Sequence, residues 1–368
     1  MTDAAANIAD YAHLFLNDVP MMDVRAPIEF AQGAFPGAIN VPLLDDLQRE
    51  LIGTEYKQKG QEAAIALGLR LATPEIRAQR LTAWRNFIET YPQGVLYCFR
   101  GGLRSRTTQQ WLRDQGMDYP LVVGGYKALR RFLIDSLEDH LQTQPVWLLS
   151  GRTGTGKTDV LQQLPYFLDL EGLAHHRGST FGYTVTPQPA QISFENEISI
   201  GFLKHHHRYP AMPLVLEDES RLIGRLSLPP SLQEKMKPAP LLVLEASLAE
   251  RENRVIRDYI VRQRQDYETV FGAEAAGKFA EFVLHNLYRI RNRLGGERHQ
   301  QLQQEWSDAL VAFESEGCVE GFRSGIRRLL VEYYDPMYDY QLSKKQGEIL
   351  CRGDAATIMA WVRQQLPR

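Results

Sequence analysis

The sequence has few of the features that mark secreted, membrane-spanning or disulfide-rich proteins. It has three cysteines in 368 residues, Cys98, Cys318 and Cys351, and their wide spacing predicts neither a disulfide framework nor a paired metal motif. No apolar run reaches the length of about 18 residues that a membrane helix needs, and no basic segment leads into an apolar one near Met1. These absences argue against secretion and membrane insertion, and they favour a reducing, cytoplasmic setting.

An excess of charge of one sign is also absent. The chain has 42 Lys and Arg against 45 Asp and Glu, a formal net charge of −3, so any nucleic-acid contact must use a local basic patch. There is no internal repeat, low-complexity tract or Gly/Ser linker. With 44% apolar and 24% charged residues, the composition is that of an ordinary folded protein, and the length suggests about two domains.

Short apolar runs alternate with helix-like segments along most of the chain. In the first part, strands are expected at 20–25, 37–42, 95–99 and 119–125, with helices at 104–115 and 126–141. In the second part, strands are expected at 145–150, 212–219 and 239–246, with a helix at 157–164. From about residue 247 the pattern is helical, and Pro336 is expected to break a helix. The alternation predicts two α/β domains with parallel sheets, residues 1–140 and 141–368, the second ending in a helical region.

Cys98 stands where an expected strand enters a loop with two glycines and two arginines, VLYCFRGGLRS at 95–105. Such a loop can turn successive backbone N–H groups inward to form an anion-binding nest, and the start of the following helix adds positive charge. With Arg100 and Arg104 nearby, this setting predicts a nucleophilic thiolate beside an oxyanion pocket. The alternative is a small buried core cysteine, which is the expected state of Cys318 and Cys351.

Residues 8–140 resemble the rhodanese family. The resemblance rests on the Cys98 loop and on MDVRAPIEF at 22–30, GAFPGAINVP at 33–42 and VVGGYKALRRF at 122–132. It implies a rhodanese-like fold whose loop cysteine carries sulfur or selenium, and a structural motif at Asp23 and Arg25. Common sulfurtransferase loops have four residues between Cys and Arg, whereas this loop has five. The longer loop is similar to that of phosphatase-type relatives, which suggests a phosphorus-bearing substrate or donor.

The segment GRTGTGKT at 151–158 matches the phosphate-loop motif G-x4-G-K-T, and it has the required strand before it and helix after it. The expected phosphate-binding residues are Gly151, Arg152, Thr153, Gly154, Thr155, Gly156, Lys157 and Thr158. In this motif the backbone amides wrap a phosphate, the lysine contacts the terminal phosphates and the last hydroxyl is placed for Mg²⁺. The motif therefore predicts a P-loop NTPase-like domain, although phosphate binding does not by itself mean hydrolysis.

An acidic segment follows another expected strand, in LVLEDES at 214–220. One of its carboxylates, Glu217, Asp218 or Glu219, could hold a metal ion or a water next to the phosphate loop. The alternative is an acidic loop at a strand end, and spacing alone does not decide which carboxylate points to the site.

Two rows of basic residues fall on expected helix faces. Arg251, Arg254 and Arg257 recur every three residues, and Arg289 and Arg293 follow His285 every four. Such rows could contact phosphates of a nucleotide-like ligand or of RNA, or they could form a solvated, salt-bridged surface. The run KHHHRYP at 204–210 favours a polar helix end over a metal site, because consecutive helical histidines point in different directions. No metal site is expected.

A reactive-cysteine loop and a phosphate loop in one chain are a narrow combination. Together with EDESRLIGR at 217–225 and YYDPMYDYQ at 333–341, they resemble the bacterial tRNA 2-selenouridine synthase family over essentially the whole length. The resemblance implies a tRNA-modifying transferase that replaces sulfur by selenium in wobble 2-thiouridine. It implies S-geranylation with geranyl diphosphate first, and then selenation with selenophosphate. No tightly bound cofactor is implied, and an enzyme that supplies selenophosphate is an expected partner.

Mapped onto this chain, the resemblance implies that Cys98 carries selenium or engages selenophosphate, with Arg100, Arg104 and the amides of Phe99, Gly101, Gly102 and Leu103 holding the oxyanion. Lys157 and Thr158 would bind the diphosphate. One alternative is a rhodanese-type sulfurtransferase or a Cys-x5-Arg phosphatase fused to an ATP-hydrolysing domain. Another is a non-catalytic RNA-binding protein that uses the phosphate loop as a nucleotide sensor, against which the intact Cys98 loop argues. Oligomeric state leaves no signal in the sequence.

Overall fold

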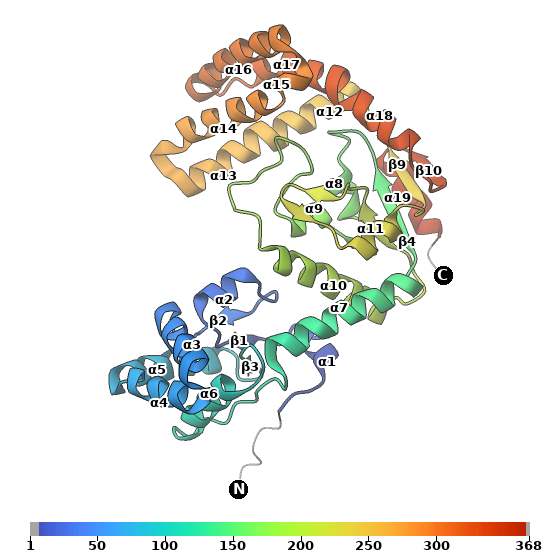
Figure 1. Cartoon of the computed structure of the whole chain (residues 1–368). Coiled ribbons are helices and arrows are strands. Elements are labelled where there is room, and N and C mark those ends of the chain that lie inside the picture. Colours follow the sequence, from blue (N-terminus) through green and yellow to red (C-terminus); the bar gives the residue numbers. More distant parts are fainter. Residues whose placement is uncertain (1–6, 366–368) are drawn as a thin grey trace. The chain divides into compact units, whose positions relative to one another are not determined.

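The chain forms two compact units in the computed structural model, which describes residues 7–365 (Figure 1). The first unit contains the chain up to Gln142 together with Ala190–Arg208, and the second contains Thr143–Pro189 and the chain from Tyr209 onward. This division differs from a single boundary at residue 140. Helix α10 (Gln191–Arg208) belongs to the first unit because its Ile200 and Leu203 are buried in that unit's core.

The first unit is built on a small parallel sheet with the strand order β2-β1-β3. The strands are β1 (Met21–Asp23), β2 (Ile39–Asn40) and β3 (Val95–Tyr97). Every residue of β1 and β3 is buried, as expected for strands covered on both faces. The helices are α1 (Tyr11–Leu16), α2 (Pro27–Gln32), α3 (Asp46–Lys59), α4 (Gln61–Leu71), α5 (Pro74–Thr90), α6 (Leu103–Arg113), α7 (Gly125–Thr143) and α10.

Local sequence signals set several helix starts in this unit. The side chain of Asp45 accepts a hydrogen bond from the Gln48 backbone N–H, and the Gln48 side chain accepts one from the Asp45 backbone N–H, which forms a capping box at the start of α3. The Thr73 side chain caps α5 by accepting from the Ile76 backbone N–H, and Pro74 follows at the first helical position. The expected helices 104–115 and 126–141 are confirmed as α6 and α7.

The second unit contains a parallel sheet of five strands in the order β10-β9-β4-β6-β5. The strands are β4 (Val146–Ser150), β5 (Phe167–Leu168), β6 (Leu214–Glu217), β9 (Leu241–Leu244) and β10 (Ile349–Gly353). Three of them, β4, β6 and β9, fall where strands were expected. The edge strand β10 was not expected, because the sequence after residue 247 was interpreted as helical. A short antiparallel pair, β7 (Leu222–Ile223) and β8 (Leu226–Ser227), follows β6.

Helices cover the sheet and form a second core beside it. The helices near the sheet are α8 (Lys157–Leu161), α9 (Leu170–Leu173), α11 (Pro230–Met236), α12 (Leu248–Val255) and α19 (Ala355–Gln364). The helical region contains α13 (Arg262–Phe271), α14 (Ala275–Arg289), α15 (Arg291–Leu294), α16 (Gly296–Glu316), α17 (Arg323–Arg328) and α18 (Asp335–Ser343). Figure 1 shows α13, α14 and α16 side by side, and Phe279, Trp306 and Phe322 are buried in their shared core.

Pro336 does not break the helix, contrary to the sequence prediction. It lies in the first turn of α18, directly after a π-helical stretch at Leu329–Tyr334, and α17 runs into that stretch without a loop. A wider turn tolerates a residue without an N–H group, because the regular hydrogen-bond ladder is already interrupted there. The helix therefore continues to Ser343 and brings Asp335 and Asp339 to the phosphate loop.

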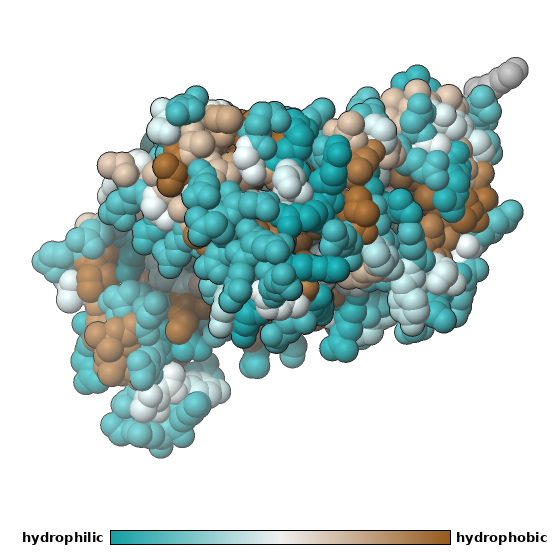
Figure 2. Space-filling view, turned by 90° about the horizontal axis from the view of Figure 1, so that it is seen from above, coloured by the Kyte–Doolittle hydropathy of each residue, from teal (hydrophilic) through white to brown (hydrophobic). Residues whose placement is uncertain are grey.

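The face of the molecule in Figure 2 is covered mostly by hydrophilic side chains, with smaller hydrophobic patches between them. Within residues 7–365, no helix combines the length and the apolar character that a membrane span requires.

Candidate functional site

The Cys98 loop follows β3 directly and leads into α6. Cys98 is buried, its carbonyl oxygen accepts a hydrogen bond from Tyr126 N–H (2.9 Å), and the carbonyl of Phe99 accepts one from Lys127 N–H (2.9 Å). These bonds tie the loop to the start of α7. Among the described residues, no backbone carbonyl accepts from the N–H groups of 99–102, so these amides are available to an anion.

Glycine is required where the loop meets the start of α7. Gly101 has φ +60, and a Cβ there would lie 2.7 Å from Gly124 N and 2.9 Å from Val122 O. Gly125 has φ +59, and a Cβ there would collide with the Cys98 carbonyl. A side chain at either position would push the loop away from α7, so both glycines set the position of Cys98.

The two predicted arginines of this loop differ in their surroundings. Arg104 is bound by the carboxylate of Glu29 from α2, with Nη1–Oε2 at 2.5 Å and Nη2–Oε1 at 3.1 Å. Arg100 is exposed and packs near the ring of Phe99, 5.8 Å from its centroid. The fork of Arg104 is therefore held in one orientation, whereas Arg100 is the arginine open to solvent. Glu29 was not singled out from the sequence.

Asp23 and Arg25 form a buried ion pair in the first unit. Arg25 Nη2 lies 2.7 Å from Asp23 Oδ2 and also donates to the Gly33 carbonyl at 2.8 Å. The guanidinium lies 3.8 Å from the centroid of the Tyr126 ring. Nε and Nη2 of Arg25 are both hydrogen-bonded, and 2% of its side chain is exposed. The pair therefore holds β1, α2 and α7 together and has almost no surface for a ligand.

The phosphate loop joins β4 to α8, as the motif predicts. Gly154 and Gly156 have φ +80 and +86, which L side chains rarely adopt. A Cβ at Gly154 would lie 2.9 Å from the Arg251 carbonyl. Thr155 Oγ1 donates to the Arg152 carbonyl (2.9 Å), which closes the loop into a cradle at the carboxyl end of the sheet.

Lys157 and Thr158 begin α8. Lys157 Nζ donates to the Gly151 carbonyl (3.1 Å), across the mouth of the loop, and lies 5.5 Å from the Tyr338 ring centroid. Burial lowers the pKa of Lys157, but Tyr338, Glu171 and Glu219 outweigh it and raise the pKa. Lys157 therefore stays charged, and a bound phosphate could replace the Gly151 carbonyl as its acceptor.

Helix α18 clamps the phosphate loop through two ion pairs. Arg152 donates to Asp339 through Nε (2.9 Å) and Nη2 (2.6 Å). Arg251 donates to the Thr153 carbonyl through Nε (2.8 Å) and to Asp335 through Nη1 (3.0 Å) and Nη2 (2.5 Å). Arg251 is 3% exposed, so this predicted RNA or phosphate contact serves instead to hold the loop.

The other predicted basic contacts are separated by the fold. Arg254 lies over the phosphate loop, because a Cβ at Gly156 would be 3.2 Å from Arg254 Nε. The Arg254 side chain forms no salt bridge within the described part of the chain. Arg257 pairs with Asp159 and Asp258. Arg289 and Arg293 are exposed on the helical region, against Tyr183 and Tyr333. Arg254 is therefore the member of these rows with an open phosphate-facing position.

The three predicted carboxylates have three different environments. Asp218 forms an ion pair with Lys345. Glu217 is fully buried, and its Oε2 accepts from Glu171 N–H (3.0 Å) while its Oε1 has no partner among residues 7–365. Glu219 lies near Glu171, which the sequence analysis missed: a Cβ at Gly178 would collide with Glu171 Oε1 and lie 2.9 Å from Glu219 Oε1. Both members of this pair interact with Lys157.

No cluster of three or more metal-ligating His, Cys, Asp or Glu residues occurs in the stretch from 7 to 365. The histidine run lies at the end of α10, which terminates at Arg208; His205 is buried and His206 packs against His140 at 4.4 Å between ring centroids. Thr158 at the start of α8 is the residue that would bind Mg²⁺ beside a bound phosphate.

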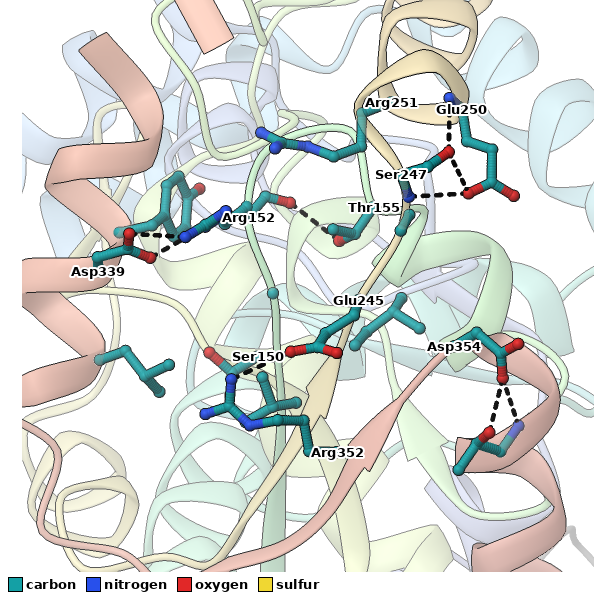
Figure 3. Close-up of a pocket in the computed structure, with 17 residues that line it drawn as sticks. Ser150, Arg152, Thr155, Glu245, Ser247, Glu250, Arg251, Asp339, Arg352 and Asp354 are labelled. Atoms are coloured by element: carbon teal, nitrogen blue, oxygen red, sulfur yellow. Dashed lines mark hydrogen bonds and ion pairs between the residues drawn. The ribbon is translucent and has the colours of Figure 1, made fainter. Parts of the chain in front are cut away.

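Two cavities border the phosphate loop. The larger, about 670 Å³, lies between the loop, the ends of β9 and β10, and α18, and Figure 3 shows its charged lining. Arg152 there faces Asp339, and Arg352 lies 3.1 Å from Glu245. The smaller cavity, about 40 Å³, begins at Thr153 and is otherwise lined mainly by aromatic and aliphatic side chains of the helical core. The loop thus separates a polar recess from an apolar one.

His176 follows α9 and is 4% exposed, and neither ring nitrogen has a partner among the described residues. Burial, with a smaller effect of Arg289, lowers the pKa of His176 to about 4. An unfolded histidine titrates near 6.5, so between pH about 6.5 and about 4 only the unfolded chain takes up this proton. We expect acidification through this window to lower the free energy of unfolding by up to about 3 kcal/mol.

Denaturant titrations of the wild type and His176→Phe across this pH range measure the effect as the difference between the two profiles. The same change at exposed His207 is the control. Parallel profiles for the wild type and His176→Phe would contradict the expectation.

Comparisons with known proteins agree with this geometry. Residues 144–368 match the family model described as the tRNA 2-selenouridine synthase AAA domain. Curated relatives named tRNA 2-selenouridine synthase match over nearly the whole chain. Those from Marinobacter nauticus and Alcanivorax borkumensis are 54% and 51% identical, each over 97% of this chain and 97% and 98% of their own. That from Pseudomonas syringae pv. syringae is 49% identical, over 98% of this chain and 99% of its own. The chain therefore belongs to the tRNA 2-selenouridine synthase family.

Proposed function

We propose that this chain is a cytoplasmic tRNA-modifying transferase that replaces the sulfur of wobble 2-thiouridine by selenium in two steps. The observation that carries the proposal is the identity of about half of all residues with tRNA 2-selenouridine synthases over nearly their full length. In the first step the thio group is geranylated with geranyl diphosphate. In the second, selenium from selenophosphate displaces the geranylated sulfur.

The order of the steps has a chemical reason. A thiocarbonyl sulfur is a poor leaving group, whereas an S-alkylated sulfur departs as a thiolate after selenium adds to C2 of the base. One site must therefore bind a diphosphate ester, and another must deliver selenium.

We assign selenium delivery to the first unit, as a rhodanese-like domain with Cys98 as its reactive group. The unbonded amides of the loop and the exposed Arg100 would bind the phosphate oxygens of selenophosphate, while Arg104, fixed by Glu29, would complete the cradle. The five-residue gap between Cys98 and Arg104 suits a tetrahedral donor. An enzyme that produces selenophosphate is the expected partner.

We assign the geranyl diphosphate to the phosphate loop of the second unit. Lys157, Arg254 and the loop amides would bind its two phosphates, and Thr158 would ligate Mg²⁺ if the diphosphate binds as a magnesium complex. The apolar cavity that starts at Thr153 supports an isoprenoid chain rather than a nucleoside. Since this cavity measures about 40 Å³, its side chains must move apart to admit ten carbons.

The test is mass spectrometry of a 2-thiouridine anticodon stem-loop incubated with the protein, geranyl diphosphate and selenophosphate, each omitted in turn. We expect a geranyl adduct without selenophosphate and a thio-to-seleno mass shift with both. Unchanged RNA in every reaction would overturn the proposal.

A second candidate is a nucleoside triphosphate at the phosphate loop, in a sulfurtransferase or phosphatase fused to an ATP-hydrolysing domain. The polar cavity of about 670 Å³ favours it, because charged and hydroxyl groups there could bind a base and ribose. It predicts ATP turnover that depends on Lys157 and needs no RNA. Calorimetry that measures competition between ATP and geranyl diphosphate for the protein shows which of the two ligands binds more tightly.

Arg254→Ala is expected to weaken binding of diphosphate by about 10- to 100-fold, because it removes one charge-assisted hydrogen bond at an otherwise intact loop. Calorimetry with inorganic diphosphate measures the change. Arg262→Ala is the matched control, since Arg262 is an exposed arginine that pairs with Asp258. Equal affinity of Arg254→Ala and the wild type would place Arg254 outside the phosphate site.

A further inference from the structure

Three arginines where α14 meets α15 differ from every other arginine of the helical region (Figure 1). Arg289, Arg291 and Arg293 form no salt bridge with any residue that the structure describes. The remaining arginines of the region all pair with carboxylates: Arg262, Arg264, Arg298, Arg323, Arg327 and Arg328. In a region where salt bridges are the rule, three closely spaced positive charges are therefore left without a carboxylate partner.

Neutral groups hold Arg289 and Arg293 in place. Arg289 donates to the Tyr183 hydroxyl (3.5 Å) and to Asn286 Oδ1 (3.4 Å), and its guanidinium carbon lies 5.1 Å from the Tyr183 ring centroid. Arg293 donates to the Tyr333 hydroxyl (2.9 Å). A tyrosine orients a guanidinium group without cancelling its charge, so both arginines keep their full charge at the surface.

Arg291 lies flat on an exposed aromatic ring. Its guanidinium carbon is 3.8 Å from the ring centroid of Tyr288, and its Nη1 donates to the Tyr288 carbonyl (3.1 Å). The Tyr288 side chain is 51% exposed, which is unusual for a large aromatic residue of a packed helix. A guanidinium stacked on a ring keeps the N–H groups at its edge free for an anion.

The surface around these arginines contains few acidic residues. The segment 285–299 has one carboxylate, Glu297, and the segment 181–189 has no charged residue. Glu332 is the other carboxylate nearby, and it pairs with Arg298. An anionic partner would therefore meet little repulsion here. We call the three unpaired arginines and the tyrosines that hold them, Tyr183, Tyr288 and Tyr333, the basic patch.

The basic patch is connected to the phosphate loop through Tyr333. Asp335 comes two residues later in the same continuous helical stretch, an advance of about 3 Å along a helix axis. The carboxylate of Asp335 binds Arg251, which donates to the Thr153 carbonyl of the phosphate loop. Only a few side-chain lengths therefore separate the patch from the loop, and a long anionic ligand can contact both.

We propose that the basic patch binds the sugar–phosphate backbone of the RNA substrate, beside the wobble nucleotide. This inference rests on the proposed function. The planar fork of an arginine donates two parallel hydrogen bonds to one phosphate, and its rigid orientation on a tyrosine lowers the entropy that binding costs. Backbone contacts fix the position of an RNA and carry no sequence information, so the patch positions the RNA while other residues recognise the base.

The test is fluorescence anisotropy of a labelled 2-thiouridine anticodon stem-loop, between about 50 and 200 mM salt. It compares the wild type with Arg289→Ala, Arg291→Ala, Arg293→Ala and the triple variant. Each phosphate contact contributes about 0.7 to 0.9 to the slope of log K against log salt concentration. We expect the triple variant to bind about 10- to 100-fold more weakly at low salt, with a slope that is shallower by about 2 to 3.

Three further measurements distinguish a backbone contact from other roles. The loss of affinity should be the same when uridine replaces 2-thiouridine, because the backbone does not report the base. Binding of geranyl diphosphate should be unchanged, and geranylation should show a raised KM for RNA with the wild-type kcat. Arg262→Ala is the matched control, since Arg262 is an exposed arginine whose charge Asp258 already compensates.

The outcomes separate this inference from the proposed function. Wild-type affinity and salt slope in the triple variant, or weaker binding with an unchanged slope, would overturn RNA as the partner and would point to an acidic protein surface. A stem-loop that binds through the patch but is never geranylated would overturn the proposed function alone. A wild type that does not bind the stem-loop would overturn both. Circular dichroism checks folding, and the single variants decide the matter if the triple variant does not fold.

Discussion

Replacement of Cys98 by alanine is expected to abolish selenation of 2-thiouridine RNA while geranylation continues at the wild-type rate. The thiol that we propose to react with selenophosphate is lost, and no other thiol lies on the loop, so we expect the selenation rate to fall by at least about 10³-fold. The S-geranyl intermediate should accumulate, because we assign its formation to the phosphate loop of the other unit. Mass spectrometry of the RNA over time follows both products.

Cys318→Ala and Cys351→Ala are the matched controls for this experiment. Both cysteines are partly buried; Cys318 follows the end of α16 and Cys351 lies within β10. We expect both variants to selenate normally. Selenation that survives in Cys98→Ala and fails in a control would move the reactive group away from the Cys98 loop.

Lys157→Ala is expected to abolish the geranyl adduct. In the proposed mechanism Lys157 supplies the charge that binds the diphosphate and stabilises it as it leaves, and the loss of one such donor in an enclosed site lowers rates by about 10²- to 10³-fold. Lys157 donates to the Gly151 carbonyl and also interacts with Glu171 and Glu219, so circular dichroism of the variant checks that it is folded. Geranylation of the stem-loop and calorimetry with geranyl diphosphate measure the two effects.

A second RNA separates the two sites in this variant. When a stem-loop that already carries the S-geranyl group is supplied with selenophosphate, Lys157→Ala should form the seleno product as the wild type does. Lys237→Ala serves as the control, since Lys237 is an exposed lysine at the C-terminal end of α11. Unchanged geranylation by Lys157→Ala would exclude the phosphate loop as the diphosphate site.

The phosphate loop and the Cys98 loop could be located from sequence because each depends on neighbouring residues. Small residues, a lysine and a hydroxyl in a fixed order make the cradle between β4 and α8, and the loop has that form in the structure. Strands β4, β6 and β9 were equally visible, since buried parallel strands are short apolar runs. The family followed from the combination of these motifs.

Other features depend on contacts between residues far apart in the chain. The sequence did not indicate that α10 packs with the first unit, because its apolar residues fit a core of either unit. It also did not indicate β10, a short strand with partly exposed residues that pairs with β9 more than 100 positions earlier. No local pattern encodes which distant strand supplies the partner.

The sequence by itself determined the positions of the two glycine-rich loops, the order of most α/β segments and the family. Only the tertiary structure decided which charged side chains belong to each site. Arg251 and Arg254 are three positions apart on one helix, yet Arg251 is buried in an ion pair with Asp335 while Arg254 faces the phosphate loop. Glu171 and Glu219 come from different elements and lie near each other only because the carboxyl ends of β5 and β6 lie side by side in the sheet. The charge of a side chain can be read from the sequence, but only the fold shows whether another residue of the chain already neutralises that charge.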